Sequence, residues 1–96
     1  MAAYLVVDSD IHDAGAYDRY KAGARPILER HGGEYIVRGG ALDVVEDGTG
    51  TPTRLVIVKF PDAASARAAL DDPEYAPLRA LRQGAAKATL AIVEGI

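Results

Sequence analysis

The chain has no cysteine, no tryptophan and only two histidines among its 96 residues. Without cysteine it can build no disulfide scaffold, thiolate zinc site, iron–sulfur cluster or cysteine nucleophile. The two histidines, His12 and His31, are not spaced like the ligands of a metal motif. The sequence therefore predicts a protein with no metal site and no cofactor.

The chain also lacks an excess of basic residues and a long hydrophobic run. It carries 11 Lys and Arg against 14 Asp and Glu, a net charge of −3. It therefore has no basic footprint of the kind that binds nucleic acid or an anionic membrane. The apolar run Tyr4–Val7 is followed at once by acidic residues and is too short for a signal peptide or a membrane span. These features predict a cytoplasmic protein with no nucleic-acid or membrane partner.

Apolar residues are plentiful, at 49% of the chain, which is enough for one small domain over residues 1–96 with a modest core. Their spacing predicts strand, helix, strand, strand, helix and strand, in that order. The order is that of the split βαβ motif, a ferredoxin-like α+β sandwich with an antiparallel sheet. The expected elements are a strand at Tyr4–Val7, a helix from Asp13 to Gly32, strands at Glu34–Arg38 and Arg54–Phe60, a helix from Asp62 to about Leu70, a helical segment from Asp72 to Gly84 and a strand at Lys87–Glu94.

Local signals support the expected helix boundaries. Asp13 and Asp62 are good N-caps, and the glycine pair at Gly32 is a typical helix stop. Pro26 predicts a kink, not a break, because the apolar stripe of the first helix continues in phase beyond it. Pro77 is expected to split the last helical segment into one turn followed by a helix.

The predicted strands are apolar on both faces, although the helices of such a sandwich cover only one face. A second copy of the same sheet is the economical cover for the other face. We therefore expect a homodimer, with two sheets packed face to face in a dimeric α/β barrel. The alternative is that the β-branched runs reflect strand propensity on a partly exposed face. The alternating pairs are Tyr4 and Val6 with Leu5 and Val7, Leu55 and Ile57 with Val56 and Val58, and Leu90 and Ile92 with Ala91 and Val93.

One strand carries a charged residue where alternation predicts an apolar one. In regular pleating Tyr35 and Val37 share one face, and Ile36 and Arg38 share the other. The following pair Gly39-Gly40 permits a bulge or a bend, and we expect an extended continuation over Ala41–Glu46. Arg38 is expected to point away from bulk water, either beneath the helices or toward the partner sheet. A buried guanidinium there needs an acid, backbone carbonyls or an anionic ligand.

Other residues suit the same chemistry. His31 closes the first helix, where it serves either as a cap that the helix dipole favours or as a proton-transfer group. Tyr75 and Arg82 share one face of the last helical segment. Together with tyrosines they would suit a small carboxylic, phenolic or enolic acid. The candidate catalytic residues are His31 and Arg38, and the candidate ligand-binding residues are Arg38, Tyr75, Arg82, Tyr17, Tyr20 and Tyr35.

Two functional hypotheses follow from these residues. In the first, the protein binds or transforms a small organic acid, with Arg38 and Arg82 holding the anion and His31 moving a proton. In the second, the protein is a non-catalytic dimer whose arginines form internal ion pairs. The acidic partners would be Glu46, Glu74 or Glu94.

Several segments, in this order along the chain, resemble one known family, that of the domain of unknown function 1330 within the dimeric α/β-barrel superfamily. The resemblance implies a ferredoxin-like protomer, a face-to-face dimer and a site at Arg38, His31, Tyr75 and Arg82. It implies no particular reaction, because the superfamily contains cofactor-independent monooxygenases, isomerases and proteins that only bind ligands. The segments are His31-Gly32-Gly33, Tyr35 to Gly40, the strand ending in Phe60-Pro61, Asp72-Pro73-Glu74-Tyr75, Leu81-Arg82 and Val93-Glu94-Gly95.

Overall fold

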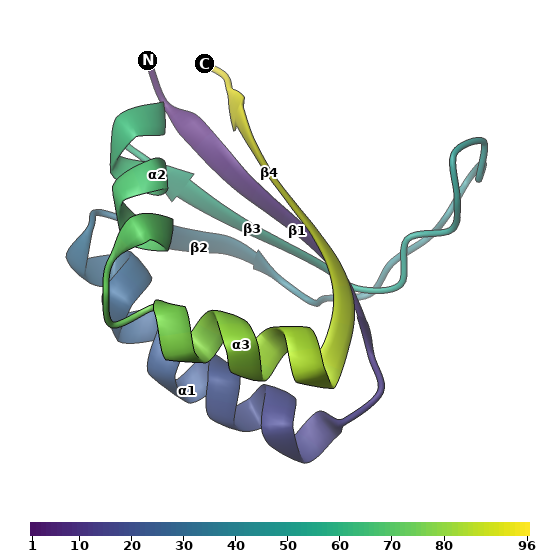
Figure 1. Ribbon diagram of the computed structural model, residues 1–96. Coiled ribbons are helices and arrows are strands. Elements are labelled where there is room, and N and C mark those ends of the chain that lie inside the picture. The colour runs from purple at the N-terminus through teal and green to yellow at the C-terminus, as the bar shows by residue number, and fades with distance from the viewer.

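The computed structural model describes residues 1–96 and has the predicted ferredoxin-like βαββαβ arrangement, with the helices on one face of an antiparallel sheet (Figure 1). The strand order across the sheet is β2-β3-β1-β4, and each neighbouring pair is antiparallel. Because β1 and β4 pair antiparallel, the N-terminus of the chain lies beside its C-terminus (Figure 1). The elements are β1 (Ala3–Ile11), α1 (Ala14–Arg30), β2 (Glu34–Arg38), β3 (Leu55–Phe60), α2 (Ala63–Asp71), α3 (Ala76–Ala85) and β4 (Ala86–Glu94).

The first strand is longer than predicted, because the polar residues after Val7 continue it instead of ending it. Ser9 points to the helices and is 1% exposed, and its Oγ accepts a hydrogen bond of 3.2 Å from the Tyr17 hydroxyl. Asp8 and Asp10 alternate with it and lie opposite Thr89 and Lys87 of β4. The polar end of β1 is compatible with the sheet because Ser9 has a hydrogen-bond partner on the helix side, while Asp8 and Asp10 lie on the opposite face.

The helix caps are as predicted. Asp13 accepts a hydrogen bond from the Ala16 amide, and Asp62 accepts one from the Ser65 amide. Helix α1 runs unbroken through Pro26, and Gly32 ends it with a φ of +91°. None of the three helices is long and apolar enough to cross a membrane.

Helix α1 packs mainly against α3 and α2. The side of α1 that faces β2 and β3 makes few close backbone contacts with these strands. A close contact with α3 holds it there, because a Cβ on Gly23 would lie 2.6 Å from Leu78 Cδ2. The core is accordingly divided into two clusters. One lies between α1, α3 and the β4 start, and the other lies between α2, the end of α1 and the sheet. Space remains between α1 and the β2 side of the sheet.

Strand β2 contains a bulge that the sequence analysis did not predict. The pairing of β2 with β3 shifts between Tyr35 and Val37, so Ile36 is an extra residue. Tyr35 then lies opposite Val58, and Arg38 lies opposite Val56. An inserted residue reverses the alternation beyond it. The prediction that Tyr35 and Arg38 occupy opposite faces is therefore wrong, since both point to the helix side.

The face of the sheet away from the helices is apolar at its centre and has both apolar and charged residues toward its ends. Val6 and Ile57 lie opposite each other on this open face, and Ala91 lies on the other side of Val6. Lys59 and Asp10 stand nearer the ends. The residues predicted to make this second face apolar all lie on it, and Asp8, Asp10 and Lys59 add charges among them. These predicted residues are Tyr4, Val6, Leu55, Ile57, Ala91 and Val93.

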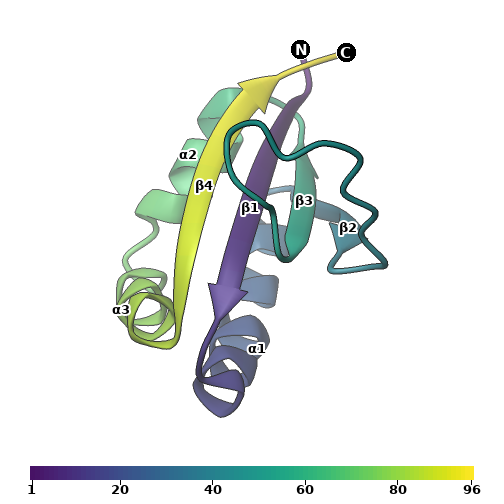
Figure 2. The same cartoon turned by 90° about the vertical axis from the view of Figure 1, so that its right-hand side faces the viewer.

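The connection between β2 and β3, residues 39–54, projects from the body as an arm, clearly seen in Figure 1 and facing the viewer in Figure 2. It forms no strand, so the segment Ala41–Glu46 does not lengthen β2 in the sheet. Val45 on this arm is 86% exposed and Leu42 is 39% exposed. The arm carries apolar side chains that this protomer does not cover.

Candidate functional site

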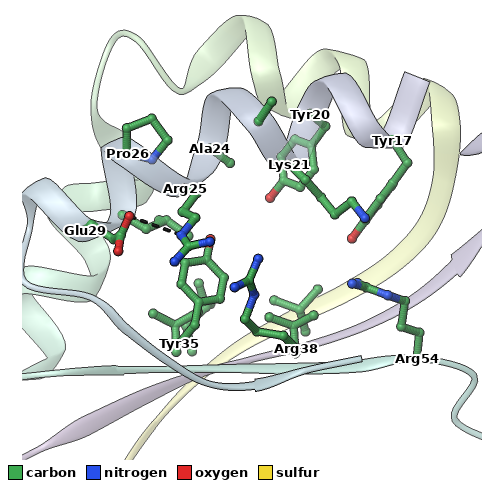
Figure 3. Close-up of a pocket in the computed structure, with 16 residues that line it drawn as sticks. Tyr17, Tyr20, Lys21, Ala24, Arg25, Pro26, Glu29, Tyr35, Arg38 and Arg54 are labelled. Carbon is green, nitrogen blue, oxygen red and sulfur yellow. Dashed lines mark hydrogen bonds and ion pairs between the residues drawn. The ribbon is translucent and has the colours of Figure 1, made fainter. Parts of the chain in front are cut away.

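A cleft of about 590 Å³ occupies the space between α1 and the sheet. Figure 3 shows the side chains of α1 reaching down into it and those of β2 and β3 rising toward them. Its volume is in the range of small-molecule sites. The residues that line it are Leu5, Val7, Tyr17, Tyr20, Lys21, Ala22, Ala24, Arg25, Pro26, Leu28, Glu29, Tyr35, Arg38, Arg54, Val56 and Val58.

The cleft concentrates positive charge in an acidic protein. Four basic side chains line it against one acidic side chain, Glu29. Arg25 is 3.3 Å from Glu29, and Lys21 is 3.2 Å from Asp18, so these two already have partners on α1. No carboxylate forms a salt bridge with Arg38 or with the remaining arginine, Arg54. The cleft therefore offers two arginines whose charge is free for an anion.

Tyrosine rings orient these arginines. The guanidinium of Arg38 lies 5.5 Å from the centre of the Tyr35 ring, and that of Arg25 lies 5.8 Å from the same ring. Arg54 lies 5.6 Å from the centre of the Tyr17 ring. Such cation–π contacts stabilise a cation without neutralising it. Arg38 remains exposed at the mouth of the cleft, so the prediction that it leaves bulk water is wrong.

Burial keeps two phenols of the cleft protonated. It raises the pKa of Tyr35 to about 12, and the negative charge of Glu29 adds to this shift. Burial, together with the neighbouring Tyr75, also raises the pKa of Tyr20 well above its ordinary value. At neutral pH both hydroxyls are hydrogen-bond donors and not bases.

The structure places four of the predicted ligand-binding residues in the cleft lining: Arg38, Tyr17, Tyr20 and Tyr35. Tyr75 and Arg82 lie outside this lining. Tyr75 is 1% exposed, and its hydroxyl oxygen lies 2.8 Å from that of Tyr20.

Arg82 is 7% exposed and its guanidinium lies 5.9 Å from the centre of the Tyr20 ring, while its Nε has no hydrogen-bond partner. Arg82 and Tyr75 thus contact a wall of the cleft, Tyr20, from behind. Neither Arg82 nor Arg38 forms a salt bridge with Glu46, Glu74 or Glu94, as the second hypothesis expected, although another arginine, Arg30, does pair with Glu74.

His31 also lies outside the cleft lining, in a cluster of charged residues that ties α1 to the α2–α3 connection. Its Nε2 lies 2.9 Å from Asp72 Oδ2, and Arg30 donates hydrogen bonds to Asp72 and to Glu74. Asp72 Oδ1 accepts a further bond from the Glu74 amide. The structure does not bring His31 together with Arg38, and its surroundings are those of a helix-capping histidine.

This cluster gives a prediction for acid stability. Hydrogen bonds from His31, the Glu74 amide and Arg30 hold the pKa of Asp72 below its ordinary value of 3.8. A carboxylate with a lowered folded-state pKa stabilises the fold above its unfolded-state pKa, and this contribution is lost as the pH falls through the folded value. Asp72→Asn should therefore lower the urea midpoint at pH 7. Below about pH 4 the difference in urea midpoint between the variant and the unchanged protein should become smaller. An equal loss at both pH values would contradict the assignment.

Three basic residues of the cleft were not identified from the sequence: Lys21, Arg25 and Arg54. A signal for the first two exists, because Tyr17, Lys21 and Arg25 are four residues apart and therefore share one face of α1. Arg54 gives no such signal, since it directly precedes β3. The structure has no group of three or more histidine, aspartate or glutamate residues that could hold a metal ion.

The fold is that of several solved structures. The RPA0582 protein of unknown function from Rhodopseudomonas palustris is 20% identical, with a TM-score of 0.78 over 99% of this chain and 82% of that one. SnoaB, a cofactor-independent oxygenase from Streptomyces nogalater, is 12% identical, with a TM-score of 0.68 over 99% and 93%. A dimeric ferredoxin-like protein of unknown function from Jannaschia sp. CCS1 is 18% identical, with a TM-score of 0.67 over 99% and 100%.

These likenesses, all below 25% identity, show the fold alone. No curated protein sequence matches the chain. The family model described as domain of unknown function (DUF1330), in contrast, matches residues 2–96. The match confirms the resemblance seen in the sequence, and the chain belongs to the DUF1330 family.

Proposed function

We propose that the protein binds a small organic acid in the cleft between α1 and the sheet. The observation that supports this function best is Arg38, an unpaired guanidinium over the Tyr35 ring at the mouth of a 590 Å³ cleft. A planar guanidinium offers two parallel donors to a carboxylate. The hydroxyl of Tyr35 stays protonated and can donate to the same anion or to a phenolic oxygen.

The lining also determines what kind of acid fits. Its floor is apolar, with Leu5, Val56 and Val58 between the charged walls. An acid with an aromatic or aliphatic body would bury that body there. Phenolic acids are included among the ligands to test, because the protonated hydroxyl of Tyr35 can donate to a phenolic oxygen.

The protein is proposed to act as a homodimer that pairs through the open face of the sheet. The apolar centre of this face around Val6 and Ile57 supports the proposal, as does the arm with its exposed Val45. The Jannaschia relative of the same fold is described as dimeric. The cleft opens on the helix side, so pairing through the other face would leave it accessible.

The test is a binding screen with benzoate and 4-hydroxybenzoate, with uncharged benzamide as the matched control. At a concentration of a hundred times Kd, a bound acid stabilises the fold by about 2.7 kcal/mol. This should raise the melting temperature by roughly 10 to 20 °C for a domain of this size. Benzamide should give no shift, and salt should weaken the binding of the acids. Equal shifts with benzamide, or no shift with any acid at millimolar concentration, would contradict the proposal.

A further inference from the structure

The two free arginines of the cleft stand at different positions along it. Arg38 lies opposite Val56 in the β2–β3 pairing, and Arg54 precedes Val56 by two residues on the neighbouring chain segment. Two residues of extended chain correspond to about 7 Å. Figure 3 shows the two side chains rising from the sheet side by side, with Arg54 beyond Arg38 in the direction away from Tyr35.

The backbone fixes the place of Arg54. Gly39 has a φ of +69°, and a Cβ there would lie 2.6 Å from Arg54 Nε and 2.9 Å from its Cζ. The guanidinium thus passes directly over the backbone of Gly39, the residue that follows Arg38 in the chain. On its other side it faces the Tyr17 ring at 5.6 Å. Glycine tolerates both the positive φ and the close approach.

The two arginines differ from the other cations of the cleft in having no acidic partner. Lys21 and Arg25 are paired with Asp18 and Glu29 of the same helix. Like charges repel, so two unpaired guanidinium groups facing one cleft are unfavourable unless anions offset them. A ligand with one acidic group can serve one of them fully, whereas a ligand with two can serve both.

We propose that the cleft selects an elongated diacid, with one acidic group at Arg38, the other at Arg54 and an apolar body between them over Val56. This inference rests on the proposed acid-binding function and adds the number and spacing of the acidic groups. It assigns Arg54 as the residue that determines the specificity for the second group. Arg38 binds one acidic group of the ligand, whether the ligand is a monoacid or a diacid.

Three aromatic acids test this assignment by calorimetry. Benzoate has one carboxylate, phthalate has two adjacent ones, and terephthalate has two at opposite ends of the ring. Terephthalate should bind about tenfold more tightly than benzoate, the effect of one further hydrogen-bonded ion contact. Phthalate has the same charge as terephthalate and should bind more weakly than it, because its carboxylates cannot reach both arginines. Equal affinities for phthalate and terephthalate would overturn the spacing.

Variants of the protein separate the two arginines. Arg54→Met should lower the ratio of terephthalate affinity to benzoate affinity from about ten to about one, because only the diacid uses the second guanidinium. Arg67→Met removes an exposed charge of α2, away from the cleft, and should change neither affinity. If Arg54→Met weakens both ligands equally, both arginines hold a single group and the inference is wrong, while the proposed function stands. If none of the three acids binds, the proposed function itself fails.

Discussion

Replacing Arg38 by methionine is expected to lower the affinity for benzoate by roughly 10- to 100-fold, the range for a hydrogen-bonded ion contact. The substitution removes the cation at the mouth of the cleft and keeps an unbranched apolar side chain over Tyr35. The fold should be unaffected, because Arg38 is exposed and forms no ion pair, so its loss leaves no buried acid unpartnered. Calorimetry measures the affinity, and urea unfolding measures the stability.

Two further variants sharpen this experiment. Arg38→Lys keeps the charge but loses the planar fork, so an intermediate affinity would show that both charge and geometry contribute. Arg67→Met is the matched control for loss of one positive charge, since Arg67 is exposed on α2. If Arg38→Met unfolds the protein or leaves benzoate affinity unchanged, Arg38 is a structural residue and does not hold the ligand.

The order and type of the elements could be predicted from sequence because each depends on local signals. The N-caps Asp13 and Asp62 and the stop at Gly32 act within one turn of their own helices. Pro26 could be placed inside α1 because the apolar stripe on both sides of it is in phase. The end of β1 could not be predicted, because the acceptability of Ser9 there depends on the Tyr17 hydroxyl, which comes from another element.

The placement of Arg38 on the same face as Tyr35 was missed for a related reason. Alternation predicts faces only in a regular strand, and the bulge at Ile36 reverses them over a single residue. Ile36 is an ordinary strand residue and not a glycine or another turn former, so the sequence does not indicate a bulge there. In the structure its side chain is 48% exposed. The pairing partners Val56 and Val58 belong to a strand beyond a long arm, and their register with β2 is a tertiary property.

The types of residue in the candidate site could be predicted from the sequence, but not all of the particular residues that line it. Arginine and tyrosine were expected together, and Arg38, Tyr17, Tyr20 and Tyr35 do line one cleft. Two placements could not be predicted from the sequence. His31 forms a hydrogen bond with Asp72, outside the cleft, and Arg54 comes close to Arg38 because its side chain passes over the backbone of Gly39. Both placements depend on the packing of distant segments.

Ile57→Asp is expected to convert the proposed homodimer into a monomer. Ile57 lies opposite Val6 at the centre of the open face, where a second copy would bury it. A carboxylate enclosed there without a partner costs several kcal/mol, which weakens association by roughly 100-fold or more. In the separate protomer the new side chain faces water, so the fold and the cleft on the helix side should persist.

Sedimentation equilibrium at micromolar concentration measures this effect, and benzoate binding shows that the monomer retains its cleft. Ala64→Asp is the matched control, because Ala64 is exposed in the first turn of α2, on the helix side, where a negative charge is favourable. The control should remain dimeric. A monomeric unchanged protein, or a dimeric Ile57→Asp variant, would show that the open face is not the interface.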